Sequence, residues 1–242
     1  PARQELFWFD INNKKLLAAK ADGTMADTWH FDEIVTAAAI VNGDELAIAT
    51  ETGLKRLNLA TRTIAPVVAI EDDIPANRTN DCRIHPSGAF WIGTMVKEEG
   101  PKNGSVYHYL AGTITRIIEH AAIPNATCFS PDGRIASWTD TPTQRILKCD
   151  TDPDTGLPVG EWTLFADLAG QRGYPDGAVI DSEGYLWNAR WGGSCVVRHA
   201  PDGSVDRIVE VPVSQVTCPA FGGKDLRTLF ITTANKTLSP EK

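Results

Sequence analysis

The chain has 242 residues, of which 42% are hydrophobic and 22% are charged, and its formal net charge at pH 7 is −8. This length is enough for one large domain with a sizeable core. The negative charge argues against nucleic acid or an anionic membrane as the main partner, because both require basic surfaces. No apolar run reaches the roughly 18 residues of a membrane-spanning helix, so we expect no transmembrane segment.

The cysteines indicate a reduced, cytoplasmic protein. They are odd in number and widely spaced, and no C-x-x-C pair occurs that would suggest a zinc knuckle or a thioredoxin-like motif. Free cysteines are usually small buried side chains, which is what we expect for most of them. They are Cys82, Cys128, Cys149, Cys195 and Cys218.

Short apolar segments with a period of two dominate the chain and are broken by Gly, Pro, Asn and Asp, which predicts an all-β fold. The best helical pattern, residues 32–40, is too short and too rich in alanine to define a helical domain. A turn followed by an apolar strand that ends in small or polar residues recurs six times. In chain order the copies are residues 3–10, 42–50, 86–94, 131–139, 182–190 and 224–232.

The copies are spaced by roughly 40 to 50 residues, the period of propeller blades. A ring of blades buries both faces of each sheet, which one four-stranded sheet cannot do alone. Further segments read as third strands that return after tight turns; they are residues 53–58, 144–150 and 195–203. We therefore predict that residues 1–242 form a single six-bladed β-propeller, with a β-sandwich of evenly spaced hairpins as the alternative.

Polar residues precede three of the copies at a similar offset of five to eight residues. Arg78, Asn80 and Asp81 precede the third copy, Asn125 the fourth and Asp176 the fifth. In a propeller this offset would bring them to one end of the central channel. Amide and carboxylate oxygens suit a hard divalent cation such as Ca²⁺, Mg²⁺ or Mn²⁺, with Zn²⁺ bound through oxygen ligands as a further option.

The same residue types also form turns, and that alternative stays open for Asn125 and Asp176. It is the preferred interpretation for Asp81 and Asp140. The histidines have no metal-ligand spacing, so His85 and His199, like His108, are interpreted as surface or strand residues. The pair Gly192–Gly193 predicts a hairpin turn, and the absence of a G-x-S-x-G elbow gives no support to a serine hydrolase.

Several motifs in a fixed order resemble the gluconolactonase, SMP-30 and luciferin-regenerating family of six-bladed propellers, along essentially the whole chain. They are Arg78-Thr-Asn-Asp81 with residues 85–95, Asn125 with residues 129–133, residues 174–177 with 181–187, and residues 211–223. The resemblance implies a metal-dependent lactonase that hydrolyses lactones of sugar acids, with Ca²⁺ or Zn²⁺ as the expected cation.

The resemblance also implies roles for individual residues. Asn125 and Asp176 match metal ligands, and Asp176 is in addition the candidate general base. Asn80 matches a polar residue close to the metal, Arg78 a substrate-binding arginine, and Glu98 a carboxylate that contacts sugar hydroxyls. A small sugar lactone is the expected partner.

The sequence departs from the family pattern in two ways. The family's first metal ligand is a Glu in an L-G-E-G-P-x-W-like motif that would come directly before Pro1, and relatives continue beyond Lys242, so we expect a chain truncated at both ends. Cys82 stands where many members have Gly, and Ala126-Thr127 replaces the commoner Gly-Leu.

Lactone hydrolysis is the first functional hypothesis: the cation polarises the lactone carbonyl, and Asp176 or a metal-bound water drives the attack. A propeller that binds a protein or small ligand without catalysis is the second, although the WD signature of interaction propellers is absent. A third keeps the metal site but hydrolyses another ester, including an organophosphate.

Overall fold

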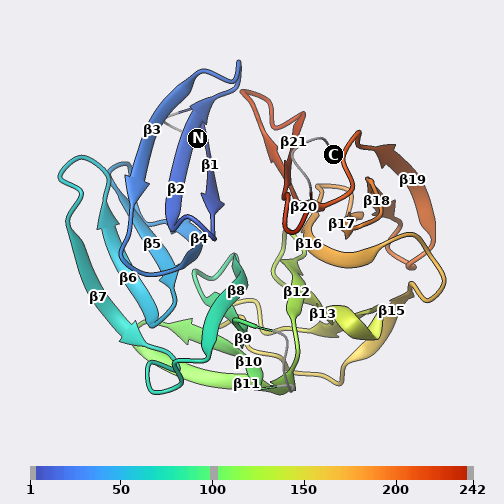
Figure 1. Ribbon diagram of the computed structural model, residues 1–242. Helices are drawn as coiled ribbons and strands as arrows, with labels where there is room; N and C mark the ends of the chain where they lie inside the picture. Colours follow the sequence, from blue (N-terminus) through green and yellow to red (C-terminus); the bar gives the residue numbers. More distant parts are fainter. Residues whose placement is uncertain (1–3, 99–102, 239–242) are drawn as a thin grey trace. The chain divides into compact units, whose positions relative to one another are not determined.

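The computed structural model describes residues 4–98 and 103–238, and the chain divides into two compact units. The first comprises Pro1–Ile84, Phe90–Ala122 and Gly222–Thr228; the second comprises His85–Ala89, Ile123–Phe221 and Leu229–Lys242. The strands are labelled in Figure 1. Arg3, where the first repeat copy begins, lies outside the described residues.

The first unit contains three antiparallel sheets in which consecutive strands are neighbours. The first sheet consists of β1 (Glu5–Asp10), β2 (Lys15–Lys20) and β3 (Met25–His30). The second consists of β4 (Val35–Ile40), β5 (Glu45–Thr50), β6 (Gly53–Asn58) and β7 (Ile64–Ala69). The third consists of β8 (Asn77–Ile84), β9 (Phe90–Val96), β10 (Gly104–Leu110) and β11 (Thr113–Ala121).

The second unit continues the same meander. Its four-stranded sheets are β12 (Pro124–Phe129), β13 (Ile135–Asp140), β14 (Arg145–Asp150) and β15 (Thr163–Asp167), then β16 (Tyr174–Ile180), β17 (Leu186–Trp191), β18 (Cys195–His199) and β19 (Val205–Glu210). Strands β20 (Val216–Gly222) and β21 (Thr228–Thr233) form a two-stranded sheet, and a 3-10 turn, η1 (Thr141–Thr143), joins β13 to β14. Among the described residues, no helix is long and apolar enough to cross a membrane.

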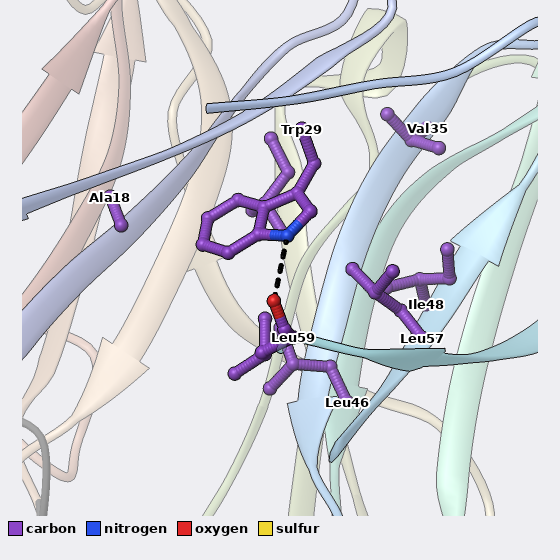
Figure 2. Packing of buried hydrophobic residues seen from close by; sticks show 8 residues of the cluster. Ala18, Trp29, Val35, Leu46, Ile48, Leu57 and Leu59 are labelled. Carbon is purple, nitrogen blue, oxygen red and sulfur yellow. Dashed lines mark hydrogen bonds between the residues drawn. The ribbon is translucent and has the colours of Figure 1, made fainter. Parts of the chain in front are cut away.

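Alternation along the strands explains why the sheets stack. In β5, Ile48 belongs to the core between the first and second sheets, while the next residue, Ala49, belongs to the core between the second and third. Successive side chains of a strand point to opposite faces, so this second sheet is buried on both sides. Figure 2 shows the first of these cores, in which the Trp29 indole N–H donates to the carbonyl of Leu59 at 3.3 Å.

The second unit is built in the same way. Ile146, Leu168 and Leu186 are buried between its two four-stranded sheets. Val196 and Val216 are buried between the β16–β19 sheet and the β20–β21 pair. Full burial of an aliphatic side chain of this size contributes about 1.5–3 kcal/mol, so these cores hold the sheets in order.

The fold class is confirmed as an all-β propeller, but the prediction of six blades is wrong, because the described residues form five. The repeat copies correctly located β1, β5, β9, β13, β17 and β21. The sixth copy, residues 224–232, does lead into a strand, yet β21 has only β20 as its neighbour in the described part of the chain. Each repeat copy predicts one strand of a sheet and does not predict how many further strands pair with it.

Candidate functional site

The predicted site residues lie at irregularities in the first strands of three sheets. In β8, β12 and β16, three residues advance against two of the neighbouring strand, so each strand contains one extra residue, a β-bulge. Asn80 and Asp176 are the first residues inside their bulges, and Asn125 directly precedes the bulge of β12. Bulges re-aim side chains and are common next to active sites, which sets these residues apart from the regular ladder.

The bulge of β12 has a further irregularity. Ala126 has a φ of 52°, in the left-handed region. For a residue with a Cβ this conformation is unfavourable by roughly 1–2 kcal/mol, whereas glycine adopts it without that cost. This cost accounts for the glycine that the resembling family more often has at this position.

In the second unit, one hydroxyl connects the two predicted metal ligands. Asn125 is 5% exposed, and its Nδ2 donates to Thr141 Oγ1 at 2.9 Å. Thr141 Oγ1 in turn donates to the carbonyl of Pro175 at 2.9 Å, one residue before Asp176. The half-buried Asp176 is also fixed through its own carbonyl, which accepts from Asn188 Nδ2 at 2.9 Å. The structure thus brings Asn125 and Asp176 together on the neighbouring strands β12 and β16.

In the first unit, a second pair of predicted residues is joined directly. Arg78 Nη1 donates to Asn80 Oδ1 at 2.9 Å and to the carbonyl of Thr79 at 2.8 Å. Thr79 is fully buried, and its hydroxyl donates to the carbonyl of Thr50 at 3.1 Å. Because that hydroxyl proton is used, Thr36 Oγ1 must donate to Thr79 Oγ1 across 2.7 Å. These hydroxyl hydrogen bonds anchor β8 at Thr79, which lies between Arg78 and Asn80.

Glu98 is exposed and lies just past the end of β9. Asn77, which precedes Arg78, pairs with Val96, so Glu98 belongs to the same end of the third sheet as Arg78. Its neighbour Lys97 is held by an ion pair to Glu51 and by a 2.7 Å hydrogen bond to the carbonyl of Pro75. The backbone leading to Glu98 is therefore anchored.

Asn125 and Asp176 would both contribute oxygen donors to a bound cation. Among residues 4–98 and 103–238, no three His, Cys, Asp or Glu side chains are grouped in a way that could hold a metal ion. Asn125 offers an amide oxygen and Asp176 a carboxylate, donors that hard cations such as Ca²⁺ prefer and commonly complete with water or other oxygens. The pair fits as part of such a coordination sphere.

The other candidates prove to be structural. Asp140 Oδ1 accepts the backbone N–H of Ile123 at 2.9 Å, in agreement with a strand-end role. Burial, reinforced by Asp81, raises the pKa of the Cys82 thiol far above its ordinary value, so this thiol is unreactive. The predicted hairpin at Gly192 is confirmed between β17 and β18.

The interpretation of three histidines as surface or strand residues is confirmed for His108 and His199, which lie in β10 and β18. It is wrong for His85, which is buried and lies just past the end of β8. The side chains of His85, His108 and His199 are 1%, 4% and 1% exposed. Each has a heteroatom that can be satisfied inside the protein, as when His85 Nε2 lies 2.9 Å from the carbonyl of Gly133. Sequence spacing gave no signal for this burial.

Two connecting residues were missed by sequence reasoning. Thr141 stands directly after Asp140, which was noted only as a strand-end carboxylate. Asn188 lies inside the fifth repeat copy, where its polar side chain interrupts the apolar pattern, and it is fully buried. A polar residue in a buried strand position is the signal that could have identified Asn188.

These sheets, three of which have polar side chains at the bulges of their first strands, form a β-propeller. The chain belongs to the SMP-30/gluconolactonase/LRE-like family, whose model matches residues 1–235. The calcium-binding protein regucalcin of Agrobacterium tumefaciens has a similar structure, with a TM-score of 0.96 and 38% identity, covering 100% of this chain and 82% of its own.

Two curated relatives carry the names of lactonases. An L-arabinolactonase of Azospirillum brasilense is 35% identical over 243 residues, which cover 98% of this chain and 79% of its own. A pentonolactonase of Haloferax volcanii is 30% identical over 237 residues, which cover 97% of this chain and 79% of its own.

Proposed function

We propose that the protein hydrolyses the lactone of a sugar acid and that Asn125 and Asp176 hold a divalent cation for this reaction. Membership of the family and the lactonase names of relatives support a lactone-hydrolysing enzyme. The observation that supports the cation assignment is that Thr141 Oγ1 accepts from the Asn125 side chain and donates to the carbonyl of Pro175, the residue before Asp176. Oxygen donors on two neighbouring strands, each at a bulge, are suited to a hard cation.

The chemistry divides between the cation and the side chains. A bound divalent cation supplies a Lewis acid that polarises the lactone carbonyl. The Asp176 carboxylate accepts a proton from the attacking water, a contribution that is typically about 10²- to 10⁴-fold. By the family resemblance, Arg78, with five N–H donors in a planar fork, and Asn80 would contact the oxygens of the lactone, and Glu98 would accept hydrogen bonds from its hydroxyls.

The binding roles follow from the chemistry of the groups. Arg78 already uses Nη1 to hold Asn80, which orients both side chains before a substrate arrives. Such preorganisation lowers the entropy lost on binding. Regucalcin's description as a calcium-binding protein supports Ca²⁺ as the first cation to test, with Zn²⁺, Mg²⁺ and Mn²⁺ beside it.

The test is a screen of five- and six-carbon aldonolactones with each cation, following acid release at constant pH. The wild type should hydrolyse at least one lactone in a cation-dependent manner. Asp176→Ala should lose this activity, while Asp154→Ala, which removes an exposed turn carboxylate, should retain it. Wild-type protein without any lactonase activity would instead favour a propeller that only binds a ligand, and cation-independent turnover would remove the metal from the mechanism.

A further inference from the structure

The hydroxyl of Thr141 forms hydrogen bonds to two neighbouring strands, β12 and β16. Thr141 opens the η1 turn after β13, and its backbone N–H donates to the carbonyl of Ile123 at 3.0 Å. The turn is further held by Thr143, whose Oγ1 donates to the carbonyl of Asp140 at 2.7 Å. Thr141 is therefore presented from a fixed backbone towards β12 and β16.

The types of donor and acceptor determine the direction of both hydrogen bonds of Thr141 Oγ1. The carbonyl of Pro175 can only accept a hydrogen bond, so Thr141 Oγ1 donates its one proton to that carbonyl. The same oxygen can then only accept from Asn125, which means that the nitrogen arm of the amide faces Thr141. The oxygen arm, Oδ1, is consequently the one turned away from Thr141.

The contact with Pro175 extends this control to the second strand. Pro175 directly precedes Asp176, and its ring restricts φ to near −65°. A hydrogen bond to its carbonyl fixes the peptide that joins it to Asp176, at the entrance of the β16 bulge. Thr141 therefore also contacts the backbone that leads into Asp176.

We propose that Thr141 is a positioning residue for the cation site: it selects the oxygen of Asn125 as the ligand atom and fixes the backbone that carries Asp176. This inference rests on the proposed cation role of Asn125 and Asp176. Groups that orient metal ligands typically change cation affinity by about 10- to 100-fold when removed. A threonine that merely stabilised the turn would leave the affinity unchanged.

Thr141→Val removes the hydroxyl while keeping the branched shape, and Thr141→Ser keeps the hydroxyl. Thr143→Val is the matched control, because it deletes a hydroxyl bond of the same turn that reaches neither Asn125 nor Pro175. The readout is the dissociation constant for Ca²⁺ and, separately, for Zn²⁺, measured by calorimetry on metal-stripped protein without substrate. Thermal unfolding in chelator checks that each variant is folded.

We expect Thr141→Val to weaken cation binding about 10- to 100-fold, with Thr141→Ser and Thr143→Val close to wild type. Equal affinities for wild type and Thr141→Val, with Asp176→Ala unable to bind, would overturn the role of Thr141 and leave the proposed cation site standing. Equal losses in Thr141→Val and Thr143→Val would also overturn it, because the effect would then belong to the turn. A wild type that binds neither cation would overturn the proposed site itself.

Discussion

Buried His199 should make the stability of the protein depend on pH well above the range in which carboxylates titrate. Its Nδ1–H donates to the carbonyl of Gly203 at 3.0 Å, so Nε2 is the unprotonated nitrogen and accepts from Arg190 Nη2 at 3.0 Å. The ring also lies against Phe165. Burial, together with the adjacent Arg190 cation, lowers the pKa of His199 from 6.5 to about 4.

The sign follows from proton binding. Between pH 6.5 and pH 4 the unfolded chain protonates this histidine while the folded protein does not, so acid favours unfolding. The stabilisation is fully present above pH 6.5 and declines as the pH falls towards 4. With these two pKa values, the free energy of unfolding should fall by about 2 kcal/mol between pH 7 and pH 5. For a chain of this size that corresponds to a fall of roughly 4–8 °C in Tm.

His199→Gln removes the titrating group while retaining an oxygen that can accept from Arg190. We expect the variant to be less stable than wild type at pH 7, because packing is lost, but to lose about 2 kcal/mol less between pH 7 and pH 5. Urea unfolding of both proteins at the two pH values, with chelator present to remove cation linkage, measures this difference. Parallel declines within about 0.5 kcal/mol would show that His199 is protonated in the folded protein or exposed, and would refute the reasoning.

Two further predictions concern the cores and the surface. Ile48→Ala should cost about 2–5 kcal/mol in urea unfolding, because Ile48 is fully buried between two sheets, whereas Ile64→Ala, at an exposed position on β7, should change stability by less than about 0.5 kcal/mol. Although burial alone would raise it, the pKa of Asp181 is held below 3.8 by hydrogen bonds from Trp187 and Arg198. Asp181→Asn should therefore cost about 1–3 kcal/mol at pH 7. The loss should shrink as the pH falls from 3.8 through the lower pKa of the folded protein, because the unfolded chain takes up the proton first; an unchanged pH 7 stability would contradict this.

The strand pattern was predictable because alternating apolar residues must pack on both faces of each sheet. All six repeat copies located strands, since each combines a turn with an apolar strand pattern. The number of blades was not predictable by the same route. The copy at residues 224–232 has the pattern of the others, but a pattern within one strand does not show whether third and fourth strands follow.

The candidate site was predictable as residue types and offsets but not as geometry. The offset before each repeat copy singled out Asn80, Asn125 and Asp176, but it did not predict that they lie on the first strands β8, β12 and β16. Bulges depend on how two strands pair, so one strand's sequence does not reveal them. The bridging role of Thr141 depends on a contact between residues 141 and 175, which a local pattern cannot encode.

The most direct test of the account combines cation binding and turnover in one sample. Metal-stripped protein should have no activity on the best aldonolactone, and titration with Ca²⁺ or Zn²⁺ should restore activity in proportion to the fraction of protein that binds one cation. Asp176→Ala should neither bind the cation nor gain activity under the same titration. Full lactone hydrolysis by metal-stripped protein, or unchanged binding and turnover in Asp176→Ala, would contradict the account.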